Sequence, residues 1–260
     1  MVFLIDMGNT QLTLALWQDG HACFKSHIPT DRTQDTAAYE QGIRAALLEA
    51  GEPVLTGCAL SSVVPPLTDT VAAAMERATG FAPVVFNCFE GLSFKVLTNE
   101  MVGADMLAGA EAVKAAGLLP AVAVDLGTAT TFCCQNKTGD VLGVAIAPGV
   151  ALGLKALVGQ ASHLRTAAMV PPEAAIGTDT EQSIRSGVIL GAAALVDGLY
   201  RRMADEMDPA EGRPSLILTG GLSGLIAPFC REQASCVPDL LLEGLAIYYE
   251  HNKKEDGSHV

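Results

Sequence analysis

Two short stretches of the chain place an acid, a glycine and hydroxyl groups directly after an apolar run. Residues 2–10 read Val-Phe-Leu-Ile-Asp-Met-Gly-Asn-Thr, with the acid at Asp6, and residues 122–131 read Val-Ala-Val-Asp-Leu-Gly-Thr-Ala-Thr-Thr, with the acid at Asp125. The apolar residues suit a buried strand, and the glycine lets the backbone turn tightly and approach a ligand. Backbone N–H groups and hydroxyls in such a turn can hold phosphate, and a carboxylate beside them can hold the accompanying cation. We therefore expect two such turns to face each other across a nucleotide cleft.

A third glycine turn, Thr219-Gly-Gly221, follows a late apolar run. In open α/β sheets ligands bind outside the carboxyl ends of the strands, where all three turns are expected. Glycine and acidic residues are also ordinary turn formers, but three such turns at strand ends, two of them with a carboxylate, favour phosphate binding. The sequence contains no Gly-x-x-x-x-Gly-Lys-Ser/Thr phosphate loop, no Gly-x-Ser-x-Gly and no His-Glu-x-x-His.

Asp105, in Gly103-Ala-Asp105, opens a predicted helix, and two interpretations of it remain open. Either it caps the helix, or it is a base that accepts the proton of a hydroxyl nucleophile during phosphoryl transfer. Thr180 also stands at a predicted helix start, where capping alone would explain it. In the helix that Asp105 opens, the i, i+3 spacing of Glu111 and Lys114 predicts a solvent-exposed pair.

Composition limits the classes of function. The chain has 260 residues with a formal net charge of −13, and 50% of its residues are hydrophobic and 17% charged. This predicts a large folded core and argues against nucleic acid or an anionic membrane surface as a partner. The seven cysteines form no Cys-x-x-Cys, so we expect reduced thiols in a cytoplasmic protein. The N-terminus lacks the basic segment of a signal peptide, and the charge-free stretch at 141–154, interrupted by Pro148, is too short to span a bilayer.

Elements of regular structure are predicted from apolar periodicity and turn residues. The predicted strands are 2–6, 11–17, 54–64, 84–87, 121–125, 130–134, 141–146 and 215–218. The predicted helices are 35–50, 68–79, 103–116, 149–158, 181–207, 223–232 and 239–251. Each half begins with a strand, an Asp-x-Gly turn and a hairpin, which predicts two α/β domains, 1–118 and 119–260, with a cleft between them.

Eight motifs follow one another in the order typical of a known family. They are Asp6-x-Gly-Asn-Thr10, Ser62-Val-Val-Pro65, Gly103-Ala-Asp105, Asp125-x-Gly-Thr-Ala-Thr130, Pro148-Gly149, Gly177-x-x-Thr180, Thr219-Gly-Gly221 and Glu243-Gly-Leu…Asn252. Over nearly the whole chain this set resembles type III pantothenate kinase. The resemblance implies duplicated ribonuclease-H-like domains of the acetate kinase/Hsp70/actin type with an interdomain cleft. It also implies ATP-dependent phosphorylation of pantothenate to 4'-phosphopantothenate, the first step of coenzyme A synthesis, by a homodimer that needs Mg2+ and a monovalent cation, K+ or NH4+.

The resemblance also implies roles for individual residues. ATP phosphates would be bound by Asp6, Met7, Gly8, Asn9, Thr10, Gln11, Leu12 and Thr13, with Asp6 near Mg2+. Asp125 would hold the monovalent cation, Thr128 would contact ATP, and Asp105 would accept the proton. The pantothenate pocket would be lined by Gly103, Ala104, Asp105 and Thr180, together with the positions of Val96 and Met106.

Three positions on the substrate side depart from the family pattern. The family usually has arginine where this chain has Met106, tyrosine where it has Val96, and proline near Asn99. Loss of a charged hydrogen bond from such an arginine is worth about 1.5–3 kcal/mol. Two alternatives to pantothenate phosphorylation therefore arise: a kinase of the same fold for another hydroxylated small molecule, or a non-catalytic nucleotide-binding regulator. The presence of Asp6, Asp105 and Asp125 argues against the second alternative.

Overall fold

The computed structural model describes residues 1–86, 90–98, 102–160 and 168–253. Two positions discussed above, Asn87 at the end of a predicted strand and Asn99, lie outside the described residues. The chain divides into two compact units. Unit 1 comprises Met1–Ser93, Glu100–Ala115 and Asp239–Val260, and unit 2 comprises Phe94–Asn99 and Ala116–Pro238. The division of the repeat at residues 118 and 119 stays a prediction.

Unit 1 contains a five-stranded sheet in the order β3-β2-β1-β4-β5. The strands are β1 (Val2–Met7), β2 (Gln11–Gln18), β3 (His21–Pro29), β4 (Gly57–Ser62) and β5 (Val84–Val85). The first three strands pair antiparallel, and β4 and β5 are parallel to β1. Asp19 and Gly20 both have positive φ, as a two-residue hairpin turn requires. The predicted opening hairpin is confirmed.

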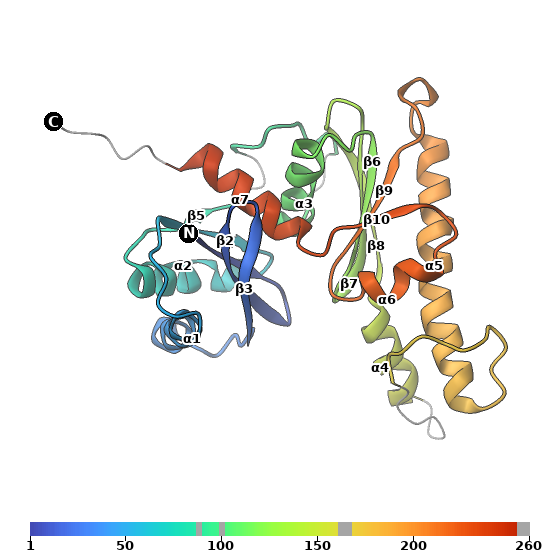
Figure 1. Cartoon of the computed structure of the whole chain (residues 1–260), viewed down its shortest axis with the longest axis horizontal. Helices are drawn as coiled ribbons and strands as arrows, with labels where there is room; N and C mark the ends of the chain where they lie inside the picture. Colours follow the sequence, from blue (N-terminus) through green and yellow to red (C-terminus); the bar gives the residue numbers. More distant parts are fainter. Residues whose placement is uncertain (87–89, 99–101, 161–167, 254–260) are drawn as a thin grey trace. The chain divides into compact units, whose positions relative to one another are not determined.

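Four helices cover the two faces of this sheet (Figure 1). They are α1 (Thr36–Glu49), α2 (Pro65–Thr79), α3 (Ala104–Ala115) and α7 (Leu240–Asn252). Phe3, Ile5 and Met7 pack with residues of α1 and α2, while α3 and α7 contact the other face at β1 and β4. The alternation of side chains along a strand therefore points Asp6 toward the face that α3 and α7 cover.

Helix α2 begins earlier than predicted. The dipeptide Pro65-Pro66 was expected to end a strand, with a helix from residue 68, but α2 begins at Pro65 itself. Proline fits the first helical turn because its missing N–H would have no intrahelical partner there. At the other end the predicted stop is confirmed, because Gly80 takes a left-handed conformation with φ of 79°.

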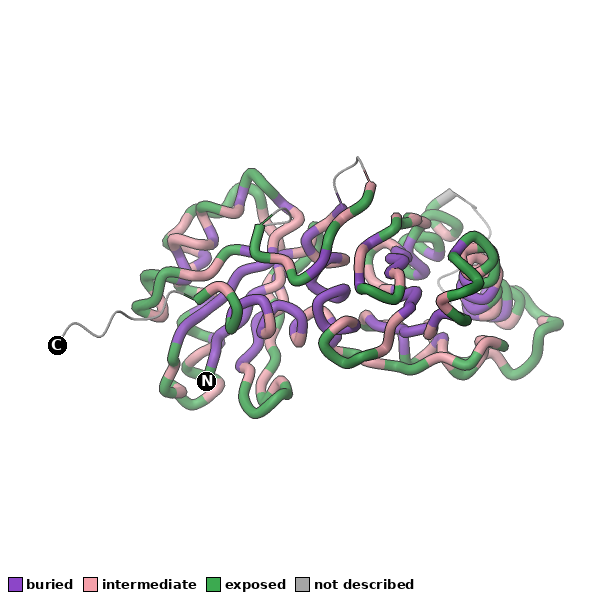
Figure 2. The backbone as a smooth tube through the Cα atoms, turned by 90° about the horizontal axis from the view of Figure 1, so that it is seen from above, coloured by how far each residue is buried: buried purple, intermediate pink, exposed green. Residues whose placement is uncertain are grey.

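Unit 2 repeats the sheet of unit 1 strand for strand, in the order β8-β7-β6-β9-β10. The strands are β6 (Ala121–Leu126), β7 (Ala129–Gln135), β8 (Val141–Pro148), β9 (Ser215–Thr219) and β10 (Ala234–Cys236). The first three again pair antiparallel, and β9 and β10 are parallel to β6. The predicted fold class, a duplicated ribonuclease-H-like α/β architecture, is confirmed by this repeat. The first strand of each repeat, β1 and β6, is almost entirely buried, and Figure 2 shows buried residues, in purple, inside both units.

The helices of unit 2 differ from the prediction at two points. They are α4 (Val150–Gln160), α5 (Thr180–Glu206) and α6 (Ser223–Ile226), with 3-10 turns η1 (Pro209–Glu211) and η2 (Ala227–Phe229). The helix predicted over 223–232 was too long, since α6 gives way to η2 and then to β10, a strand that was not predicted. The cap of α5 is Asp179, whose carboxylate accepts from the Gln182 N–H at 2.9 Å, so the expectation that Thr180 caps this helix was wrong.

Helix α5 is long and apolar enough, by length and hydropathy, to cross a membrane. Its Ile189, Ala193 and Val196 are buried in the core of unit 2 together with β6, β7 and β9. Packing against a sheet accounts for its composition, because the core helix of a globular domain has the same apolar character.

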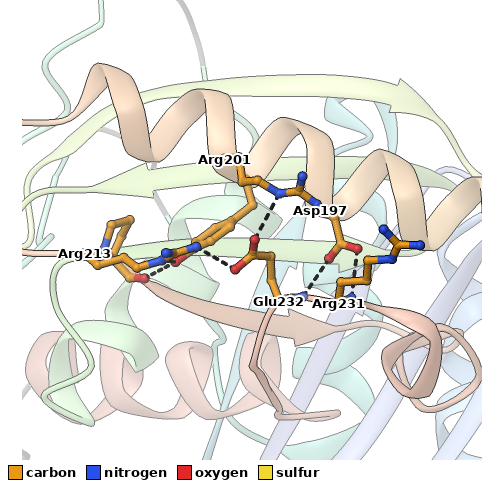
Figure 3. A network of polar contacts seen from close by, with 7 residues as sticks. Asp197, Arg201, Arg213, Arg231 and Glu232 are labelled. Carbon is orange, nitrogen blue, oxygen red and sulfur yellow. Dashed lines mark hydrogen bonds and ion pairs between the residues drawn. The ribbon is translucent and has the colours of Figure 1, made fainter.

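A polar network fastens α5 to the segment that leads into β10 (Figure 3). Asp197, which is 3% exposed, accepts from the N–H groups of Arg231 and Glu232 at 2.8 and 3.1 Å. Glu232 in turn forms ion pairs with Arg201 at 3.0 Å and with Arg213 at 2.6 Å. Because Asp197 accepts hydrogen bonds from two backbone N–H groups of an irregular segment, the network holds the segment before β10 against α5.

Candidate active site

Asp6 lies at the carboxyl end of β1, between two strands that present hydroxyl residues. Its register partner on β2 is Thr13, and its register partner on β4 is Ser61. Directly paired residues of neighbouring strands point to the same face of a sheet. Asp6 is half-buried, so its carboxylate is placed among hydroxyls on the face that also carries α3.

The turn after Asp6 is held by its own backbone. The Gly8 N–H donates to the carbonyl of Gln11 at 3.0 Å, and the Thr30 hydroxyl donates to the carbonyl of Gly8 at 2.7 Å. Asn9, Thr10 and Gln11 are exposed.

Two members of the predicted ATP-binding segment have side chains that cannot reach a ligand. Met7 and Leu12 are fully buried in the core of unit 1. Any contact that these two residues make with ATP would therefore come from their backbone.

Asp125 occupies the equivalent position in unit 2. Its register partners are Thr131 on β7 and Thr219 on β9. Gly220 follows with φ of +86°, and a Cβ at this position would overlap Oδ1 of Asp125 and lie 2.8 Å from the N atom of Leu126. Only glycine lets this turn close on the carboxylate, which gives a physical reason for the Thr219-Gly-Gly221 motif.

The turn after Asp125 is packed equally tightly. A Cβ on Gly149 would overlap the carbonyl oxygen of Thr128 and lie 2.7 Å from that of Gly127. Gly149 of the Pro148-Gly149 motif therefore packs directly against the backbone of the Asp-x-Gly turn. The Thr128 side chain itself is exposed, as a residue that contacts ATP must be.

Asp105 is the second residue of α3 rather than its cap. The carbonyl of Gly103 accepts the N–H of Leu107 at 3.1 Å, so Gly103 occupies the capping position. Burial raises the pKa of the half-buried Asp105 carboxyl, and hydrogen bonds from backbone N–H groups, including that of Met106 at 2.8 Å, partly oppose this rise. A carboxyl with a raised pKa at the start of a helix is the kind of group that takes part in proton transfer.

The residues around Asp105 shape its position. A Cβ on Gly103 would overlap Oδ1 of Asp105, so glycine is required there for the observed carboxylate position. The terminal carbon of Met106 lies 3.3 Å from the same Cβ position. The Gly103-Ala-Asp-Met106 segment thus forms one local structure in which a carboxylate and an apolar side chain lie next to each other.

Glu111 is not part of a solvent-exposed pair, contrary to expectation. It is 1% exposed, and its carboxylate accepts from the Ser93 N–H at 2.7 Å and from the Ser93 hydroxyl at 2.6 Å. Lys114 donates to the carbonyl of the same serine. These two residues of α3 therefore hold Ser93 in place, a role that their spacing in the sequence could not reveal.

Thr180 and Val96, the remaining predicted substrate residues, both lie in unit 2. Thr180 is exposed and lines an open pocket of about 540 Å3 together with residues of 177–179 and Ser183. Val96 is half-buried and forms a parallel bridge with Val141 at the start of β8. The Thr180 pocket is polar at the helix start and apolar at Leu157 and Ile184.

Ser61, which no motif of the sequence singled out, is the register partner of Asp6 on β4. Ser61 stands beside Asp6 only because β4 pairs with β1 in this register, and no short motif includes both. Among the described residues, no group of three or more His, Cys, Asp and Glu could hold a metal ion. A single carboxylate at a strand end, such as that of Asp6, suits Mg2+, which usually binds one or two carboxylates plus phosphate oxygens and water.

Two ribonuclease-H-like repeats, each with an Asp-x-Gly turn after its first strand, define an actin-like fold. Solved structures of similar fold include a Campylobacter jejuni protein assigned to the Baf family of transcriptional activators (TM-score 0.57, 18% identity, 96% of this chain and 98% of that one). Another is the ethanolamine utilization protein EutJ of Carboxydothermus hydrogenoformans (TM-score 0.56, 14% identity, 95% and 89%). At these identities the likeness establishes the fold alone.

Sequence similarity establishes the family. The family model of type III pantothenate kinase matches residues 2–202. The type III pantothenate kinase of Desulfatibacillum aliphaticivorans is 36% identical over 96% of this chain and 98% of its own length. That of Thermomicrobium roseum is 37% identical over 99% of this chain and all of its own length. The chain belongs to the type III pantothenate kinase family.

Proposed function

We propose that this protein transfers the γ-phosphoryl group of ATP to pantothenate, giving 4'-phosphopantothenate in the first step of coenzyme A synthesis. The observation that carries the proposal is the near-full-length similarity to relatives that bear the name type III pantothenate kinase. The half-buried Asp105 carboxyl with its raised pKa supports it. Phosphoryl transfer to an alcohol needs an oriented hydroxyl and an acceptor for its proton.

In the proposed reaction, Asp105 accepts the proton of the pantothenate hydroxyl. The hydroxyl oxygen forms a bond to the γ-phosphorus while the bond from that phosphorus to the β,γ-bridging oxygen breaks, and ADP leaves with its electron pair. Because the pKa of Asp105 is raised, its carboxylate is a stronger base than an exposed aspartate. Most of the catalysis would come from positioning and charge neutralisation.

On the phosphate side, the turn from Asp6 to Thr13 would bind the ATP phosphates. Mg2+ bound near Asp6 would supply charge neutralisation for the phosphates, and the hydroxyls of the register partners Thr13 and Ser61 make this end of β1 polar. Asp125 would hold K+ or NH4+, and Thr128 would contact ATP. The glycine turn that closes on Asp125 supports a compact site for a small cation.

On the substrate side, Gly103, Ala104, Asp105 and Thr180 would bind pantothenate. Met106 and Val96 would give the pocket two apolar walls where the family usually has arginine and tyrosine. Since methionine offers no charged hydrogen bond to the pantothenate carboxylate, we expect this departure to weaken substrate binding rather than to prevent turnover.

We infer that the protein is a homodimer and that α4 and α5 form its self-association surface. Helix α4 has a single charged residue, Lys155, yet Leu152 and Leu157 are 52% and 44% exposed. The neighbouring face of α5 offers the exposed glycines Gly187 and Gly191, which let another backbone approach closely. Exposed apolar surface of this kind is typical of a protein interface.

Replacing Leu152 or Leu157 with glutamate is expected to convert the dimer to a monomer, because a charge would be buried in the apolar interface. Light scattering coupled to size-exclusion chromatography measures the mass directly. Leu48→Glu is the matched control, since Leu48 is 66% exposed on α1 of unit 1 and lies outside the inferred surface. Both α4 variants remaining dimeric would contradict the assignment of this surface.

We infer a cytoplasmic location as well. The six cysteines that the structure describes are all free, as is usual for proteins of a reducing compartment.

The experiment that tests the proposed function measures ADP release by the purified protein with ATP, Mg2+ and pantothenate, with and without K+ or NH4+. We expect turnover that depends on pantothenate and rises with the monovalent cation. ADP release that is indifferent to pantothenate would contradict the proposal.

A further inference from the structure

Ser61 has a buried side-chain hydroxyl close to the turn of unit 1 that is predicted to bind phosphate. It is 0% exposed, and its Oγ makes no hydrogen bond to any residue within the described part of the chain. The next residue behaves differently: Ser62 Oγ accepts from the Val64 N–H at 3.1 Å and pairs with the Thr68 hydroxyl at 2.8 Å. Ser62 thus stabilises the start of α2, whereas Ser61 contributes no such contact.

The position of Ser61 is set by the sheet. Leu60 and Cys58 of β4 pack in the core with α1 and α2, so the alternation along the strand points Ser61 to the opposite face. Asp6 points to that face as well and is the direct register partner of Ser61. The unused hydroxyl and the carboxylate are therefore neighbours on adjacent strands, at the carboxyl ends where ligands of such sheets bind.

The repeat in unit 2 provides an internal comparison. Thr219 corresponds to Ser61. Thr219 is the register partner of Asp125 on the parallel strand β9, as Ser61 is the register partner of Asp6 on the parallel strand β4. The Thr219 hydroxyl donates to the carbonyl of Pro238 at 3.3 Å. The Thr219 hydroxyl thus has a hydrogen-bond partner within unit 2, whereas the Ser61 hydroxyl beside Asp6 can accept a ligand as its partner.

A buried hydroxyl without a hydrogen bond costs free energy that alanine would avoid. Such groups in folded proteins call for an explanation, and a ligand that completes the hydrogen bond is one. Mg2+ keeps several water molecules when it binds nucleotide phosphates, and these waters need hydrogen-bond partners.

We propose that Ser61 is a positioning residue of the magnesium site, and that its hydroxyl hydrogen-bonds to a water of the hydrated Mg2+ held at Asp6. This inference rests on the proposed function, because it takes MgATP as the ligand of the turn. It assigns to β4 a direct part in the site, in addition to the Asp-x-Gly turn of β1.

The test compares Ser61→Ala with Ser62→Ala in calorimetric titrations of ATP, with and without Mg2+ and without pantothenate. For Ser61→Ala we expect MgATP to bind about 3- to 10-fold more weakly, the change expected for one lost hydrogen bond. Binding of ATP without Mg2+ should be unchanged, and the Tm of the free protein should be unchanged or higher. Ser62→Ala should show the reverse pattern, a lower Tm and unchanged MgATP affinity. Ser61→Cys, of similar size but a weak donor, should follow Ser61→Ala.

The outcomes separate the two proposals. A Ser61→Ala variant with a lower Tm, whose ATP affinity depends on Mg2+ as in the wild type, would overturn the role of Ser61 alone. A wild-type protein that binds MgATP but does not phosphorylate pantothenate would overturn the proposed function, while the Ser61 comparison would keep its meaning. Wild-type binding of ATP that is indifferent to Mg2+ would also overturn the role of Ser61, whereas the proposed function is decided by the turnover of pantothenate.

Discussion

Asp105→Asn is expected to lower kcat for phosphoryl transfer by about 10²–10⁴-fold, the usual contribution of a general base. Asparagine keeps the shape of the side chain and an oxygen that can accept the Met106 N–H, but it cannot take the substrate proton. Steady-state kinetics with saturating ATP measure the loss. Asp35→Asn is the matched control, because Asp35 caps α1 in the same unit through the Ala38 N–H and is expected to leave kcat unchanged.

The same substitution is expected to stabilise the protein at neutral pH. The pKa of Asp105 is raised in the folded state, so between the unfolded and folded pKa values the folded protein binds more protons and its stability falls as the pH rises. The stability gained by Asp105→Asn should therefore grow from about pH 4, near the pKa of an exposed aspartate, toward neutrality. Thermal melts of both proteins across this range measure it. An active variant, or a variant whose stability relative to wild type is independent of pH, would contradict the role assigned to Asp105.

Gly244→Ala is expected to be the most destabilising small substitution in unit 1. Gly244 lies in α7, where a Cβ would overlap the carbonyl oxygen of Ala108 in α3 and lie 2.5 Å from its carbonyl carbon. Relief would require backbone movement, and overpacking of this kind costs about 1–3 kcal/mol or more. Because α3 carries Asp105, the displacement should lower activity as well as the Tm.

The control for this prediction is Gly198→Ala. Gly198 is also inside a helix, α5, but a Cβ there would meet no atom within 4 Å. Alanine should stabilise the helix at that position by about 0.5–1 kcal/mol. If the two variants changed the Tm in the same direction, the close approach of α3 and α7 at Gly244 would not be the cause.

The duplicated fold could be predicted because its signals are local. Each half carries an apolar run, an Asp-x-Gly turn and a hairpin turn in sequence, and these indicate β1 and β2 in unit 1 and the first three strands of unit 2. The bounds of β3 (His21–Pro29) were not predicted, although the hairpin turn before it was. The strand β10 (Ala234–Cys236) was missed because three residues carry too little periodicity, and its conformation depends on pairing with β9. The start of α2 was misplaced because proline is compatible both with ending a strand and with beginning a helix.

The sequence indicates candidate site residues where glycine and acid stand together, and not where strand pairing brings residues together. Asp6 and Asp105 stand in motifs, whereas Ser61 reaches Asp6 only through the register of β4 with β1. Glu111 looked like an exposed helix residue because its partner, Ser93, is 18 residues away. The register of distant segments depends on tertiary packing that local patterns do not encode.

Whether the protein phosphorylates pantothenate is tested by mass spectrometric analysis of pantothenate after incubation with ATP, Mg2+ and K+. Wild-type protein and Asp105→Asn would be compared side by side, with other hydroxylated small molecules offered as alternative acceptors. We expect 4'-phosphopantothenate from the wild-type protein and almost none from the variant. Binding of ATP without any phosphorylated pantothenate, or phosphorylation of another acceptor in its place, would contradict this expectation and would mean that the protein serves a different ligand.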